Sequence, residues 1–224
     1  MKNIAQGQTR TFINSYKTWV LLLTCILLAS FIFMLEVARD QQIPATLHGV
    51  AINPPQPLQA FVFTDHNQQE VNLGRLENHW SFLFFGFTNC PDICPATLSQ
   101  LRLIRKDIMM NPDYADNLQF LFVSVDPVRD TQAHLTEYMT YFDPSFIGMT
   151  GREEDITAFE TQLGAFHRYG SRDKHGYYSV QHSAEVYLID PAGQLTAKFH
   201  PPMDIALVSE QFSEFVRLFA DKIS

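Results

Sequence analysis

The segment Ser81-Phe-Leu-Phe-Phe-Gly-Phe87-Thr-Asn-Cys90-Pro-Asp-Ile-Cys94-Pro95 joins a continuous apolar run to a pair of cysteines. The apolar run begins with Ser81 and has no other polar side chain up to Phe87, so we expect a central strand covered on both faces. Cys90 and Cys94 are four residues apart, and once the chain turns helical their thiols face the same side. Such a pair has roughly the 6 Å Cα separation of a disulfide, and it can also hold one soft metal ion.

Strands and helices alternate on either side of this segment. Before it, residues 60–64 and 70–73 flank Asp65-His66-Asn67, which predicts a hairpin. Near the end of the chain, Asp190-Pro-Ala-Gly193 predicts a second hairpin turn. The other expected strands are 118–125, 146–149, 184–189 and 195–199, and the expected helices are 95–109, 132–141, 153–166 and 205–223. This order is typical of the α/β class, with a thioredoxin-like mixed sheet flanked by helices.

The composition is that of a folded acidic protein. The chain has 224 residues, of which 46% are hydrophobic and 18% charged, which fits one main domain with a short extra segment and excludes a disordered chain. The net charge of −8 argues against a nucleic-acid partner, which would require a basic surface. Three cysteines are too few for a disulfide-stabilised mini-protein, so their placement carries the information.

An uncharged segment near the N-terminus predicts a membrane anchor. Residues 19–35 carry no charge and would form a helix of about 26 Å, close to the roughly 30 Å core of a bilayer. All 24 acidic residues lie from Glu36 onward. The basic residues before the segment are Lys2, Arg10 and Lys17. This asymmetry predicts a cytoplasmic tail at 1–18, a single transmembrane anchor at 19–36, and a C-terminal part in the periplasm.

Other interpretations of the N-terminal segment fit less well. A cleaved signal peptide would have a shorter apolar run and a small-residue cleavage site, and neither occurs before Glu36. Lipid attachment at Cys25 would need a small residue just before it, where the chain has Leu22-Leu23-Thr24. An Arg-rich mitochondrial transit peptide is absent too, so a bacterial inner-membrane anchor is the simplest interpretation. Residues 37–57 are rich in proline and lack periodicity, which predicts a linker to a folded domain at 58–224.

A third candidate ligand is His182, which lies just before the predicted strand 184–189. In a thioredoxin-like sheet that strand neighbours the cysteine strand, so the imidazole can approach Cys90 and Cys94. The alternative is a surface or capping histidine. Two thiolates and one imidazole suit Cu(I), and the same set with a water molecule suits Zn²⁺. The cysteine loop contains no Lys, Arg or His, so we do not expect a strongly acidic thiol there.

Three motifs together resemble the Sco/SenC family of copper-binding proteins of cytochrome c oxidase assembly. They are Phe85-Gly-Phe-Thr-Asn-Cys90-Pro-Asp-Ile-Cys94-Pro95, Val123-Ser-Val-Asp-Pro-Val-Arg-Asp-Thr131 and His182-Ser183. The resemblance covers roughly residues 57–220. It implies a membrane-tethered thioredoxin-like domain in which Cys90, Cys94 and His182 bind copper, as Cu(I) and also as Cu(II). It further implies insertion of that copper into the CuA site of oxidase subunit II.

Several neighbouring residues have less certain roles at this point. The family usually carries an acidic residue directly before the histidine, and this chain has Gln181, so a charge that could tune the imidazole or guide docking is missing. Asp126 ends the second core strand, where it either tunes copper binding or stabilises a turn together with Arg129 and Asp130. His200-Pro-Pro-Met203 offers a second His and Met pair, but its position after a hairpin strand predicts an ordinary loop.

Three functional classes follow from these residues. A copper chaperone needs Cys90, Cys94 and His182, together with an upstream copper donor or thiol reductant. A thiol-disulfide oxidoreductase acting on partner cysteines needs the cysteine pair but not the histidine, and one protein can do both. Thiol peroxidases of this fold resemble one another in a Thr-x-x-Cys motif. In Thr88-Asn89-Cys90 one residue fewer separates the threonine from the cysteine, so we set that class aside.

Overall fold

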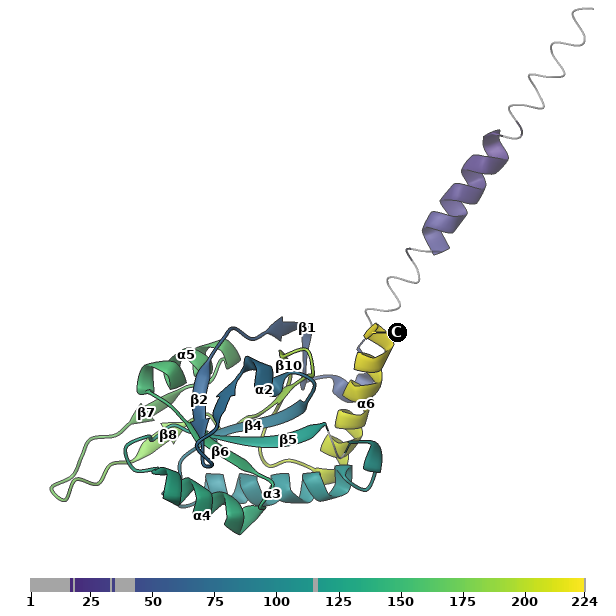
Figure 1. Cartoon of the computed structure of the whole chain (residues 1–224). Helices are drawn as coiled ribbons and strands as arrows, with labels where there is room; N and C mark the ends of the chain where they lie inside the picture. The colour runs from purple at the N-terminus through teal and green to yellow at the C-terminus, as the bar shows by residue number, and fades with distance from the viewer. Residues whose placement is uncertain (1–16, 18, 33, 35–42, 115–116, 224) are drawn as a thin grey trace, which may run out of the picture. The chain divides into compact units, whose positions relative to one another are not determined.

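The computed structural model describes residues 17, 19–32, 34, 43–114 and 117–223, and it divides the chain into two units, Met1–Ala45 and Thr46–Ser224. In the first unit, the described residues between 17 and 34 are helical (Figure 1). None of the described helices combines the length and hydropathy that crossing a membrane requires. Apart from Lys17, the predicted tail at 1–18 lies outside the described residues, as do the end of the predicted anchor and residues 37–42.

The second unit is built on an eight-stranded mixed sheet in the order β1-β10-β9-β4-β5-β6-β2-β3. Strands β4, β5 and β6 are parallel, and the strands beyond them on each side join antiparallel. The strands are β1 (Ala51–Pro57), β2 (Val62–Asp65), β3 (Glu70–Asn72), β4 (Trp80–Gly86), β5 (Leu118–Ser124), β6 (Ile147–Thr150), β9 (Val186–Ile189) and β10 (Gln194–Phe199). The helices are α2 (Leu73–Leu76), α3 (Ile93–Ile108), α4 (Gln132–Phe142), α5 (Glu153–Leu163) and α6 (Ile205–Ile223), with short 3₁₀ turns at Ala45–Leu47 and Pro112–Tyr114. The predicted α/β class and mixed, helix-flanked sheet are confirmed.

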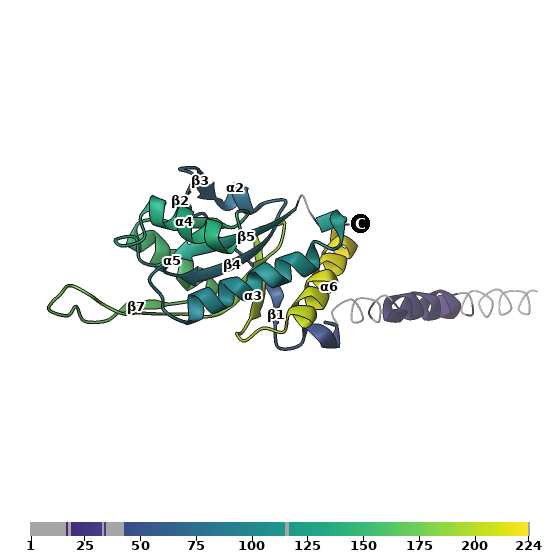
Figure 2. The same ribbon diagram turned by 90° about the horizontal axis from the view of Figure 1, so that it is seen from below.

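Strand β4 lies at the centre of the core, as its apolar sequence predicts, and every one of its residues is buried. Phe82 stacks on Phe120 of β5 with 5.0 Å between ring centroids and contacts Phe212 of α6 at 5.6 Å. Phe85 points to the opposite face, where it contacts Phe159 of α5 at 6.1 Å. Helices α3, α4 and α6 therefore cover one face of the sheet and α5 covers the other (Figures 1 and 2).

The predicted linker at 37–57 is wrong at its C-terminal end, because residues 51–57 form strand β1 and the folded unit begins near residue 46. Prolines at 54, 55 and 57 suggested irregular chain because proline cannot donate to a strand ladder. Strand β1, however, pairs only with β10 and forms an edge of the sheet, where missing N–H groups are tolerated. Its pairing is also interrupted by an irregularity between Ala51 and Gln56.

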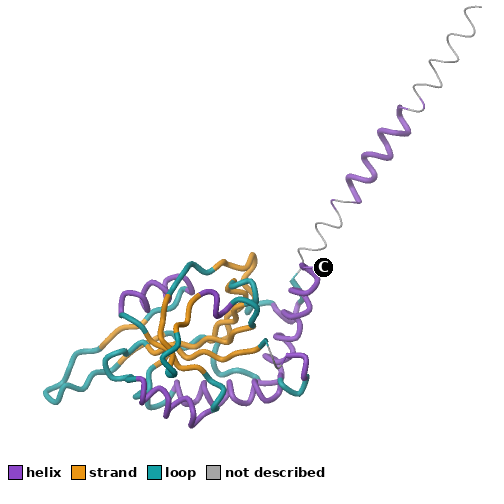
Figure 3. Tube along the Cα trace, in the orientation of Figure 1, coloured by secondary structure: helices purple, strands orange, loops and turns teal. Residues whose placement is uncertain are grey.

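A separate two-stranded ribbon, formed by β7 (His167–Tyr169) and β8 (Val180–His182), has no counterpart in the predicted elements. Residues 170–179, between the two strands, extend away from the rest of the unit as a long loop (Figures 1 and 3). Helix α5 ends before this ribbon, at Leu163 rather than at the predicted residue 166, because Gly164 adopts a left-handed conformation with φ of 66° that terminates the helix.

Candidate metal centre

The cysteine loop connects β4 to α3 and is anchored to the end of β5. Thr88 donates two hydrogen bonds to the carboxylate of Asp130, from its backbone N at 2.9 Å and from its Oγ1 at 2.6 Å. The same carboxylate accepts a bond from Ser124 Oγ at 2.6 Å. Asp130 is almost fully buried, so these three donors satisfy a group that would otherwise be costly to bury. They fix the loop two residues before Cys90.

The two thiols differ in their exposure. Cys94 lies in the first turn of α3 and is fully buried, whereas Cys90, in the loop, is partly exposed. The backbone N–H of Cys94 points to Cys90 Sγ at 3.5 Å. Gly86 makes room for the buried thiol, because a Cβ atom at this position would lie 2.8 Å from Cys94 Sγ and 2.7 Å from the Phe122 ring.

His182 completes the group from the ribbon. Its Nδ1–H donates to the carbonyl oxygen of Ser183 at 2.8 Å, which selects the tautomer with a free lone pair on Nε2. That Nε2 lies 3.3 Å from Cys94 Sγ. The edges of Phe84 and Phe87 hold the imidazole at centroid distances of 5.9 and 5.8 Å.

The three ligand atoms of Cys90, Cys94 and His182 lie within 4.8 Å of one another, close enough to hold one metal ion. Across the part of the chain that the structure describes, no other group of three or more His, Cys, Asp or Glu residues meets this condition. Two sulfur atoms and one nitrogen atom are a soft donor set, suited to Cu(I). The structure thus assembles the ligands that the motifs imply.

The environment makes the two thiols chemically unequal. A hydrogen bond from the Cys94 side chain lowers the pKa of Cys90 to about 4 against the opposing effect of burial, and hydrogen bonds from the backbone N–H groups of Asp92 and Cys94 add to the lowering. Burial raises the pKa of Cys94, and the hydrogen bond to Cys90 raises it further. The prediction that no thiol here is strongly acidic is wrong, because the hydrogen bonds that lower the pKa of Cys90 come mainly from the thiol and the backbone N–H of Cys94 on α3, and not from charged residues in the loop.

The remaining candidates stand apart from the three ligands. The carboxylate of Asp126 is fully buried and accepts a hydrogen bond from Tyr178 Oη at 2.6 Å and another from Arg129 Nε. Gln181 is exposed on the ribbon beside the ligand histidine. His200 faces Glu185, with 3.7 Å between Nδ1 and Oε1, and among the described residues it belongs to no metal-ligand group of His, Cys, Asp and Glu.

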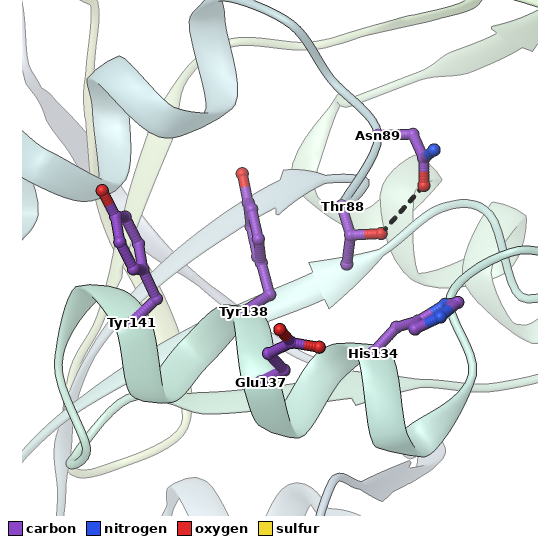
Figure 4. A pocket seen from close by; sticks show the side chains of 6 residues that line it. All are labelled: Thr88, Asn89, His134, Glu137, Tyr138 and Tyr141. Carbon is purple, nitrogen blue, oxygen red and sulfur yellow. Dashed lines mark hydrogen bonds between the residues drawn. The ribbon is translucent and has the colours of Figure 1, made fainter.

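Two pockets border the cysteine loop. One, of about 410 Å³, is lined by Cys90 and His182 together with Phe87, Pro91, Ile93, Tyr177, Ser179, Val180 and Gln181. The other, of about 370 Å³, lies between α4 and the loop. Figure 4 shows its lining, with His134, Glu137, Tyr138 and Tyr141 on α4 and Thr88 and Asn89 on the cysteine loop. Of these two pockets, only the first is lined by residues of the candidate metal centre.

Sequence reasoning missed two features of the site. The Val123–Thr131 motif contains Asp130, but nothing local shows that this carboxylate anchors Thr88 at a distance of 42 residues. The second is the ribbon, whose strands span three residues each and are too short for a period-2 signal.

Known proteins share both sequence and fold with this chain. Residues 51–217 match the SCO1/SenC family model. An SCO2-like protein of Rickettsia felis is 36% identical over 141 residues, 62% of this chain and 67% of that protein. The mitochondrial SCO2 homolog of Bos taurus is 32% identical over 182 residues, 81% of this chain and 65% of that protein's length. The crystal structure of yeast Sco1 with copper bound superimposes with a TM-score of 0.67 at 32% identity, covering 73% of this chain and 90% of that one.

Proposed function

The chain belongs to the SCO1/SenC family, and on that premise we propose that it is a copper chaperone that carries copper on Cys90, Cys94 and His182. The observation that carries the proposal is the convergence of the three ligand atoms within 4.8 Å, from a loop, a helix and a separate ribbon. A relative at 32% identity binds copper in its crystal structure, which supports copper as the metal.

The recipient that fits best is the CuA site of cytochrome c oxidase subunit II, as the family resemblance implies. The site's chemistry supports transfer rather than permanent storage, because Cys90 is partly exposed and lines an open pocket. A recipient's thiolate or imidazole can approach the copper from this pocket and replace the ligands one at a time. The proposal also includes an upstream partner. This partner is a donor that supplies the copper or a thiol reductant that first reduces the cysteines.

We place the second unit in the periplasm of a bacterium, tethered by a single inner-membrane anchor at 19–36. The support is the sequence: an uncharged segment follows three basic residues and precedes every acidic one. A fluorescent or alkaline-phosphatase fusion to the C-terminus tests this placement, because alkaline phosphatase is active only in the periplasm. An inactive phosphatase fusion would contradict the proposed topology but would leave the proposed copper site standing.

A second function, thiol-disulfide exchange with partner cysteines, is favoured by the unequal thiols. A pKa of about 4 keeps Cys90 ionised at neutral pH, as an attacking or leaving thiol requires, and Cys94 can resolve a mixed disulfide. Attack by the Cys90 thiolate on a partner disulfide forms a mixed disulfide and releases one partner thiolate. Attack by Cys94 then leaves a Cys90–Cys94 disulfide and a reduced partner.

Complementation of a strain that lacks this protein separates the two functions under copper limitation. Copper delivery predicts that Cys90→Ser, Cys94→Ser and His182→Ala all fail to restore oxidase activity. Thiol exchange predicts that His182→Ala still restores it. Oxidase activity in the Cys90→Ser strain equal to that of the wild type would contradict both functions, and an exposed-residue variant, Gln69→Ala, controls for expression.

A further inference from the structure

The strand that carries His182, β8, belongs to the separate two-stranded ribbon and pairs only with β7 among the described strands, so the contacts that hold the ribbon against the main sheet contribute to the position of this residue. The cysteines follow the central strand β4, and β9, which pairs with β4, begins four residues after His182. The distance between the nitrogen ligand and the sulfur ligands therefore reflects how the ribbon is fixed to the main sheet. The contacts between ribbon and sheet identify the residues that set this distance.

One cluster, formed by Asp126, Arg129 and Tyr178, joins the ribbon to the end of β5. Tyr178 lies on the loop two residues before β8 and is buried, and its Oη donates to Asp126 Oδ1 at 2.6 Å. Arg129 Nε bonds the other oxygen of the same carboxylate. Arg129 Nη1 donates to the carbonyl oxygen of Tyr178 at 3.0 Å.

Arg129 also contacts aromatic rings of the ribbon loop and of the cysteine loop. Its guanidinium carbon is 3.8 Å from the ring centroid of Tyr178 on the ribbon side and 5.5 Å from that of Phe87 on the cysteine side. A second arginine, Arg172, lies 4.6 Å from the Tyr178 ring centroid. A single side chain thus touches the end of β5, the loop that leads to β8 and the residue three positions before Cys90.

We propose that Arg129 is a positioning residue of the copper site, which holds the His182 ribbon at the distance from Cys90 and Cys94 that three-coordinate binding needs. The inference rests on copper binding at these ligands and not on where the copper is delivered. Arginine suits this role because its planar guanidinium donates in two directions while stacking on a ring. A lysine has a single ammonium group and cannot make both hydrogen bonds, those of Nε and Nη1, together with the ring contact.

The test compares Arg129→Lys with Tyr178→Phe, which removes one hydrogen bond and keeps the aromatic ring. The Cu(I) affinity of the full chain, purified in detergent and reduced, is measured by competition with the chromophoric ligand bicinchoninate. Partners that orient a metal ligand affect affinity by about 10- to 100-fold, and we expect a loss in this range for Arg129→Lys and a smaller one for Tyr178→Phe. The control Arg105→Gln, on α3, breaks the ion pair of Arg105 with Asp143 at the end of α4 and should leave the affinity unchanged.

A double-mutant cycle with His182→Ala distinguishes positioning from general structural support. If Arg129 acts through the histidine, Arg129→Lys lowers the Cu(I) affinity of wild type but has no further effect in the His182→Ala background. X-ray absorption of the Cu(I)-loaded Arg129→Lys protein should show two sulfur neighbours with the nitrogen neighbour reduced or lost. Equal loss in both backgrounds, or an unchanged affinity in Arg129→Lys, would overturn the proposal.

Two other results also bear on the proposal. If circular dichroism shows that Arg129→Lys is unfolded, the same cycle with Tyr178→Phe decides the question. If wild type itself binds no copper, the proposed function fails, whereas copper binding by wild type with an unaffected Arg129→Lys rejects only the positioning role.

Discussion

The Nε2 atom of His182 lies 3.3 Å from the Sγ atom of Cys94, although the two residues are 88 positions apart in the chain. The contact joins a candidate ligand on the ribbon to one on the main sheet's helix α3. The hydrogen bond from Nδ1 to Ser183 O leaves the Nε2 lone pair free to face Cys94 Sγ. Removing this imidazole should therefore change the metal site without disturbing the cysteine pair.

For His182→Ala we expect copper to remain on two sulfur atoms but to bind more weakly by at least about tenfold, or about 1.4 kcal/mol. X-ray absorption should show the nitrogen neighbour lost. The Cys90–Cys94 pair should still form a disulfide on oxidation, measurable by mass spectrometry. A nitrogen neighbour that persists in this variant would mean that another residue is the third ligand.

Alkylation of the reduced metal-free protein should be selective for Cys90. Its pKa of about 4 keeps it ionised at pH 6, where a thiol with the ordinary value of 9.0 is only about one part in a thousand thiolate. The pKa of Cys94 is raised, so that thiol should stay unmodified. Peptide mass spectrometry after brief iodoacetamide treatment checks this and separates Cys25.

The Cys94→Ser variant provides the control for this selectivity. The hydrogen bond from the Cys94 side chain is the largest cause of the low pKa, and a serine hydroxyl in its place sits differently and lacks the sulfur atom. The pH at which the alkylation rate of Cys90 is half-maximal should therefore shift upwards. Alkylation of wild-type Cys90 that begins only near pH 9 would contradict the assigned acidity.

Gly86→Ala should damage both stability and copper binding. The added Cβ would lie 2.8 Å from Cys94 Sγ and 2.7 Å from the Phe122 ring, in a fully buried place. Overpacking of this kind costs about 1–3 kcal/mol, and the thiol must move from its position opposite His182. Denaturant unfolding and Cu(I) competition measure the two effects.

Gly74→Ala is the matched control for the glycine substitution. Gly74 is exposed on helix α2, and its nearest neighbour is a side-chain oxygen of Asn72 at 3.2 Å. Because alanine favours a helix by about 0.8–1 kcal/mol over glycine, stability should stay the same or rise. Equal losses in both variants would argue against a specific clash at Gly86.

Glu160→Gln should reduce stability most at slightly acidic pH. Glu160 Oε2 lies 2.7 Å from His167 Nδ1 in an almost fully buried pair, and this hydrogen bond raises the pKa of His167 above its ordinary value. A raised histidine pKa stabilises the folded state below the unfolded value of about 6.5, and the contribution is lost as pH rises through the folded value.

The free energy of unfolding of wild type and Glu160→Gln, measured in urea at pH 6 and pH 9, checks this linkage. The difference between the two proteins should shrink at pH 9. A stability difference between the two proteins that grows with pH would mean that the hydrogen bond to Glu160 does not raise the pKa of His167.

The elements and residues that could be predicted are those with local signals. The uniformly apolar β4, the turn-flanked hairpins and the four-residue cysteine spacing each depend on near neighbours, and each lies where expected. Strand β1 was missed because its prolines are tolerated only through its edge position, which is a property of the finished sheet. The acidity of Cys90 depends mainly on a hydrogen bond from the Cys94 side chain, so the charges of the loop alone gave the wrong answer.

The prolines of β1 also make it harder for two copies of the chain to pair through this edge strand. An edge strand with free N–H groups is a template on which a second chain can add a strand, and proteins that are crowded together aggregate in this way. Prolines at 54, 55 and 57 remove donors along one edge of the sheet, and at the other edge β3 spans only three residues. Both edges of the sheet therefore offer few free N–H groups to a second chain, which disfavours aggregation through the strands.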